Sequence, residues 1–131
     1  MDFRIDPERR FIEIRLAGLL KLDQTLKSLT ALRTDPLYDP GYSQLVDCRE
    51  AEFSEITPDA LRALADRNRN ASDRVVAFVC YDDAVDKMLR LYTAYLGLEG
   101  GKRRVSIFRT PAKALAWIEE THATRRSSSE D

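Results

Sequence analysis

Polar and thiol side chains follow three apolar segments of the sequence, at the points where those segments end. The residues at these endings are Asp47, Cys48 and Arg49, then Cys80, Tyr81 and Asp82, and finally Phe108 and Arg109. If the segments are neighbouring parallel strands, their carboxyl ends meet at one edge of a sheet, where open α/β sheets bind ligands. These residue types would then form a small polar ligand site with a thiol nucleophile. The competing interpretation, which the usual behaviour of free cysteine favours, is two buried core thiols beside surface charges.

Other catalytic patterns are missing from the sequence. A cysteine–histidine pair would need the single histidine, His122, which lies at the end of the last expected helix. Gly100-Gly101 follows an expected helix and precedes an expected strand, which is the wrong order for a phosphate loop. Three acids between residues 82 and 86 are explained by helix capping and the helix dipole. We therefore predict no catalytic residue, no metal site and no cofactor, and we expect that the protein is not an enzyme.

The helix expected after Asp82 carries more apolar residues than one buried stripe needs. The candidates for an interface or a pocket lining are Met88, Leu91, Tyr92 and Tyr95. Extra apolar surface on a helix can mark a pocket or a protein interface. A helix that is buried on all sides is the alternative.

Hydrophobic periodicity predicts an α/β fold with the element order β-β-α-β-α-β-α-β-α. Strands are expected at 3–5, 11–16, 44–48, 74–80 and 105–108, with helices after each strand from the second onward. Thr57-Pro58 and Thr110-Pro111 each start a helix, with threonine at the N-cap and proline in the first turn. Gly18 is expected to break the second strand. The pattern predicts a mostly parallel five-stranded sheet with an N-terminal antiparallel hairpin.

Length and composition predict one domain over residues 1–120, followed by a disordered polar tail over 121–131. The 21 Lys and Arg residues against 22 Asp and Glu give a formal net charge of -1, which argues against a nucleic-acid binder. No apolar run is long enough to span a bilayer, so we expect no stable membrane insertion. The opening residues lack a secretory signal, and the 2 cysteines form no disulfide framework. We therefore expect a cytoplasmic location.

Three segments carry a resemblance to a known superfamily. They are Leu16-Ala17-Gly18, then Gln44-Leu45-Val46-Asp47 followed by Phe53, and finally Val105-Ser106-Ile107-Phe108 followed by the helix from Ala112 to Ile118. Together with the element order, they resemble the SpoIIAA-like proteins. This superfamily includes STAS domains, bacterial anti-sigma-factor antagonists and, more distantly, lipid-binding domains. The resemblance covers residues 1–120 and implies a regulatory or protein-interaction module of the bacterial type.

The chain departs from anti-sigma-factor antagonists at their phosphorylated serine. That serine lies in an Asp-Ser-Ser-Gly stretch, which is absent here, and Thr57 falls near its place. Phosphorylation there would act as a charge switch at a helix start. Because Pro58 and Asp59 follow Thr57, we expect its hydroxyl to cap the helix instead.

The sequence leaves three functions open. The first is a non-enzymatic STAS-like module that docks another protein or a second copy of itself as a homodimer. The second is a carrier or sensor of a small apolar or amphipathic ligand, which needs a cavity between the third and fourth helices and the sheet. The third is an enzyme that acts through Cys48 or Cys80.

Overall fold

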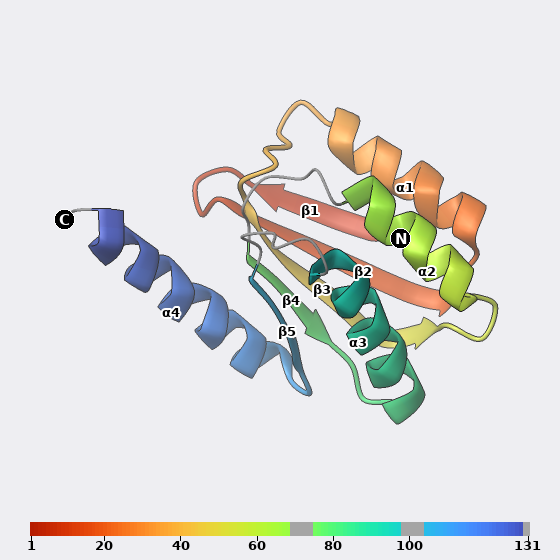
Figure 1. Ribbon diagram of the computed structural model, residues 1–131. Coiled ribbons are helices and arrows are strands. Elements are labelled where there is room, and N and C mark those ends of the chain that lie inside the picture. Colours follow the sequence, from red (N-terminus) through yellow and green to blue (C-terminus); the bar gives the residue numbers. More distant parts are fainter. Residues whose placement is uncertain (69–74, 98–103, 130–131) are drawn as a thin grey trace.

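The computed structural model describes the backbone of residues 1–68, 75–97 and 104–129, which forms five strands and four helices (Figure 1). In chain order these are β1 (Asp2–Asp6), β2 (Phe11–Leu19), α1 (Leu22–Thr34), β3 (Ser43–Glu52), α2 (Pro58–Asn68), β4 (Val75–Val79), α3 (Asp83–Gly97), β5 (Arg104–Phe108) and α4 (Pro111–Ser129). The strands form one sheet in the order β1-β2-β3-β4-β5. The pair β1–β2 is antiparallel and the other pairs are parallel, so the predicted fold class is confirmed.

The helix starts follow from local sequence. The Thr57 hydroxyl accepts a hydrogen bond from the Ala60 N–H at 3.1 Å, so Thr57 caps α2 as predicted. The Thr110 hydroxyl caps α4 in the same way, over 3.3 Å to the Lys113 N–H. An Asp82 carboxylate oxygen accepts from the Ala84 N–H at 2.7 Å and caps α3. Each cap satisfies a backbone donor that the first helical turn leaves without an intrahelical partner.

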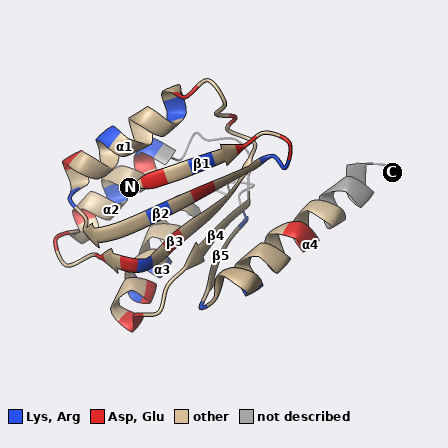
Figure 2. Ribbon diagram, turned by 180° about the vertical axis from the view of Figure 1, so that it is seen from behind, with Lys and Arg blue, Asp and Glu red and all other residues tan. Residues whose placement is uncertain are grey.

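The helices lie in two layers, one on each face of the sheet. Each parallel connection advances by one strand, so right-handed crossovers place α1, α2 and α3 on the same face. α4, the last of the described elements, folds back across the other face, as Figures 1 and 2 show from opposite sides. The two layers bury different sides of each strand.

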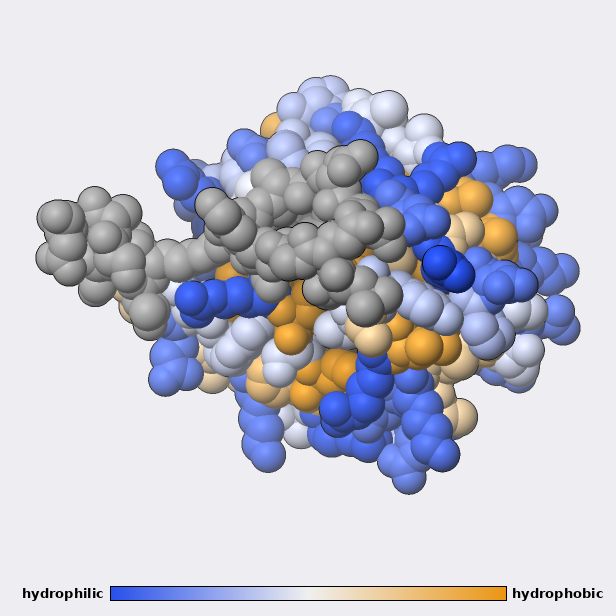
Figure 3. All heavy atoms as spheres, viewed as in Figure 1, coloured by the Kyte–Doolittle hydropathy of each residue, from blue (hydrophilic) through white to orange (hydrophobic). Residues whose placement is uncertain are grey.

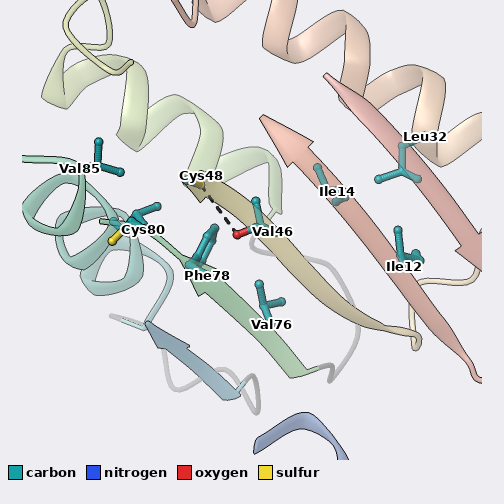
Figure 4. Close-up of a cluster of buried hydrophobic side chains, with 10 residues drawn as sticks. Ile12, Ile14, Leu32, Val46, Cys48, Val76, Phe78, Cys80 and Val85 are labelled. Atoms are coloured by element: carbon teal, nitrogen blue, oxygen red, sulfur yellow. Dashed lines mark hydrogen bonds between the residues drawn. The ribbon is translucent and has the colours of Figure 1, made fainter. Parts of the chain in front are cut away.

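Each face of the sheet has its own core. On the side of α1 and α3, the buried side chains include Ile12, Ile14, Leu32, Val46, Val76 and Phe78 (Figure 4). On the side of α4, Leu45, Val75, Ala77 and Val79 pack against Ala114 and Ile118. Because Ala77 and Ala114 are small and fully buried, α4 approaches the sheet closely.

The strands β2 and β3 are longer than predicted. β2 continues past Gly18, which has a φ of 74°, and ends at Leu19. β3 continues to Glu52, four residues beyond the expected end of this strand at Cys48. The register shifts between Arg15 and Ala17, where β3 carries one more residue than β2. Pairing with β3 continues beyond this bulge, so Gly18 stays within β2 instead of ending it.

The predicted start of the polar tail at residue 121 lies inside α4. Thr121 is buried, and its hydroxyl donates to the Trp117 carbonyl at 2.8 Å. The next residue, His122, shares a hydrogen bond with the Ser43 hydroxyl at the start of β3. The boundary drawn from sequence is therefore too early, because this contact anchors the helix after the last apolar residues.

Candidate functional site

An apolar cavity of about 120 Å³ lies between the sheet and the layer formed by α1, α2 and α3. The strands contribute Ile14, Val46, Val76 and Phe78 to its wall, and the helices contribute side chains such as Leu29, Leu61 and Leu89. In the view of Figure 3, hydrophobic atoms gather in the middle of the molecule, inside a rim of hydrophilic side chains. Protein interiors are close-packed and rarely leave voids larger than a water molecule, so this space is unusual.

The cavity arises because the helices pack unequally on the two faces. α4 packs closely on β3, β4 and β5, whereas α1 and α2 make few close backbone approaches to the sheet. Along α1, only Leu32 is buried, while Leu22, Leu26 and Leu29 are half-buried. The apolar stripe of α1 therefore borders a space that the sheet does not fill.

One end of the cavity is polar. Arg33 lies in the last turn of α1, Tyr38 lies in the following loop, and Gln44 is the second residue of β3. Because α1 runs from the carboxyl end of β2 to the amino end of β3, these three residues belong to the same end of the sheet. It is the end opposite to the strand termini on which the sequence analysis placed its polar site.

Gln44 differs from the other buried polar residues. The buried polar side chains are Ser43, Gln44, Asp47 and Thr121. Three of them have partners, since Ser43 pairs with His122, Asp47 with Arg49 and Thr121 with a backbone carbonyl. Within the described part of the chain, the Gln44 carboxamide has no hydrogen-bond partner, although only 6% of the residue is exposed. The sequence pattern predicts a strand at Gln44 and no site, although a lone amide at the start of an apolar strand is a visible signal.

The predicted polar residues at the strand ends form a charged network on the surface. Arg49 donates to both carboxylate oxygens of Asp47, from Nε at 2.9 Å and from Nη2 at 2.7 Å. Its third nitrogen lies 3.3 Å from the Tyr81 hydroxyl, and its guanidinium carbon lies 5.8 Å from the centre of that ring. Arg15 and Glu50 complete the lining of a second, polar pocket here, about 280 Å³ in volume. The neighbouring acidic and basic residues at the end of β3 are visible in Figure 2.

Arg109 joins this network to the start of α3. It donates to the Tyr81 carbonyl at 2.6 Å and to carboxylate oxygens of Asp83 and Asp86 at 3.0 and 3.1 Å. The other predicted residue of this strand end, Phe108, packs against Trp117 of α4 with ring centres 5.5 Å apart. These arginines are engaged by acids of the same chain, so the network fixes the strand ends in place.

The two cysteines do not join that network. Cys48 and Cys80 are 1% and 0% exposed, and both lie in the core on the side of α3, as Figure 4 shows. Burial raises the pKa of the Cys48 thiol well above its ordinary value, and it also raises the pKa of the Cys80 thiol. Within the described residues, no group of three or more metal-ligating side chains is arranged to hold an ion. The structure therefore does not bring thiols and charges together into one polar site.

The apolar residues singled out on α3 lie against α2. Met88, Leu91, Tyr92 and Tyr95 are half-buried and pack on the cluster of Ile56, Ala60 and Leu61. Tyr92 also lines the cavity and meets Phe78 edge-on, with ring centres 6.1 Å apart. The expected cavity between the third and fourth helices is wrong in its location, because α3 and α4 lie on opposite faces of the sheet.

Breaking the Asp47–Arg49 pair is expected to change the acid stability of the protein. Hydrogen bonds from Arg49 lower the pKa of the Asp47 carboxyl below its ordinary value, and burial opposes this only in part. The stabilisation is therefore present above the unfolded-state pKa of about 3.9 and is lost as the pH falls through the lower folded-state value. We expect Asp47→Asn to cost about 1 kcal/mol at neutral pH, measured by urea unfolding, and nothing in strong acid.

The matched variant is Arg49→Gln, which removes the partner and keeps the acid. It should lose the same part of the pH dependence as Asp47→Asn. If both variants kept the acid sensitivity of the wild-type protein between about pH 4 and pH 2, the pair would not be its source.

Comparison of the chain with known protein families, with curated proteins and with solved structures finds no match. None of the helices in the described residues is both long enough and apolar enough to cross a membrane. The fold and the cavity together define an α/β domain with a mostly parallel sheet and an apolar space between that sheet and three of its helices.

Proposed function

We propose that the protein holds a small, mainly apolar molecule in the cavity between the sheet and α1, α2 and α3, and acts as its carrier or sensor. The observation that carries this proposal is the cavity itself, about 120 Å³ in volume and lined mostly by leucine, valine, isoleucine and aromatic side chains. Pockets of this composition bind apolar ligands, with a few polar groups that fix orientation. The apolar stripe of α1, of which only Leu32 is buried, forms one wall of this space.

The other two functions have less support from the geometry. A docking module that uses the apolar side of α3 would compete with the packing of that side on α2. A thiol enzyme would need an accessible thiolate, whereas both cysteines are buried.

The resemblance to SpoIIAA-like proteins fits the proposal of a binding module without a chemical step. The five-stranded sheet in sequential order is compatible with this superfamily, which is what the sequence motifs implied. A cytoplasmic location fits the two free cysteines, because oxidising compartments favour disulfides. Both remain part of this proposal.

Titration with a small apolar probe tests the proposed function. We expect toluene to bind saturably to the isotope-labelled protein and to shift the backbone amide signals of Val46, Leu61 and Phe78. Val76→Phe should weaken this binding at least about tenfold, because the added ring occupies the cavity. Leu37→Phe is the matched control, since Leu37 is 53% exposed and lies outside the lining. Absence of saturable binding to the folded wild-type protein would overturn the proposal.

A further inference from the structure

We infer that Gln44 recognises a neutral hydrogen-bonding group on the bound molecule, and that the ligand is a single-ring compound such as a phenol or a cyclic amide. This inference rests on the proposed function and names the ligand class of the same cavity. It starts from the one buried polar side chain, among the described residues, that has no hydrogen-bond partner.

The position of Gln44 in the sheet directs its side chain into the cavity. In the strand register, Gln44 lies between Ile12 of β2 and Val76 of β4. Both neighbours point to the side of α1 and α3 in Figure 4, and alternation along β3 places Gln44 on the side of Val46. Gln44 is accordingly part of the cavity lining.

A buried amide without a partner destabilises the folded protein, so its presence calls for a physical explanation. The carboxamide offers an acceptor oxygen and two N–H donors. A ligand group that both donates and accepts, such as a phenolic hydroxyl or a ring amide, would satisfy both ends at once. The ligand thus supplies the hydrogen-bond partners that the Gln44 carboxamide lacks among the described residues.

The side chains around Gln44 favour a neutral ligand group over an ionic one. Burial of an unpaired charge among apolar side chains is far more costly than burial of a hydroxyl or an amide. Arg33 is the cationic residue of the lining, and it is half-buried with interactions of its own, as Tyr38 is. An anionic head group would therefore have no unengaged cation at this end of the cavity.

The volume limits the ligand to about one ring. An apolar protein cavity of about 150 Å³ stays dry and accommodates benzene. The space here, about 120 Å³, is of the same order and is bordered by the half-buried stripe of α1. A long acyl chain is larger than this volume, so part of it would have to extend out of the cavity.

The test compares phenol with toluene, which have nearly the same shape and differ in the hydroxyl group. Both are titrated into the wild-type protein and into Gln44→Met, which keeps the side-chain length and removes the amide. We expect the ratio of the two dissociation constants to shift by about tenfold toward toluene in the variant, a coupling of about 1.4 kcal/mol. Urea unfolding should show that Gln44→Met is no less stable than the wild-type protein.

The outcomes separate the two proposals. If neither compound binds to the folded wild-type protein, the proposed function fails, and this inference fails with it. If both compounds bind but their ratio is the same in the two proteins, the cavity binds ligands and the role of Gln44 is overturned, as it would be if a fixed water satisfied the amide. A marked loss of stability in Gln44→Met would also contradict an amide that lacks a partner in the empty protein.

Discussion

In the native protein, both cysteines are expected to react with a thiol reagent such as dithionitrobenzoate about a thousandfold more slowly than in the unfolded chain, or slower still. Cys48 lies within β3 and Cys80 directly follows β4, both near the centre of the sheet, and they are at most 1% exposed. Burial also raises the pKa of both thiols, so the reactive thiolate is scarce at neutral pH. Labelling then requires an opening of the core, which a typical domain stability of several kcal/mol makes rare.

The single variants Cys48→Ser and Cys80→Ser assign the rates to individual thiols, and the protein in concentrated urea supplies the reference rate. Fast labelling of either thiol in the native protein would contradict the buried arrangement. It would also restore the thiol-dependent enzyme as a candidate, because one sulfur would then be accessible as a nucleophile.

Local features of the sequence predicted local structure well. The three helix caps at Thr57, Asp82 and Thr110 depend on residues within three positions of each other, and all three are present. The strand expected at 74–80 is an almost unbroken apolar run, and in the structure β4 is buried on both faces, as such a run indicates. Sequential strand order and right-handed crossovers then fix the arrangement of the layers.

The polar site predicted at the strand ends does not form, because side chains alternate between the two faces of a strand. Consecutive residues point to opposite faces, so Asp47 and Arg49 lie on one side of β3 while Cys48 lies on the other. Residues that share an edge of the sheet therefore need not share a site. The alternation was readable from the sequence, whereas the bulge between β2 and β3 was not.

The cavity lay beyond sequence reasoning for a different reason. Its volume depends on the distance between the helix layer and the sheet, which is set by many side chains from both layers together. The periodicity of Leu22, Leu26, Leu29 and Leu32 predicts which side of α1 faces inward, but not that only Leu32 is buried. Gln44 becomes a candidate ligand-binding residue only when the cavity that it lines is known.

Consecutive residues of β4 are expected to respond in opposite ways to added bulk. Ala77→Leu should lower the free energy of unfolding by about 2 to 3 kcal/mol, because Ala77 is fully buried beneath the closely packed α4. Val76→Phe adds more carbon atoms, yet it should leave the stability unchanged or raise it by up to about 1 kcal/mol, because its ring enters the cavity. Urea unfolding followed by circular dichroism measures both.

The two positions control for each other, since they share a strand, a depth in the sheet and a β-ladder, and differ in the face on which the side chain lies. Any general effect of a larger side chain on β4 would therefore appear in both variants. Equal destabilisation by the two changes would mean that the space above Val76 is filled in solution. The unequal packing of the two faces, on which ligand binding and the role of Gln44 both depend, would then be absent. A large difference in stability would instead establish the cavity independently of any ligand.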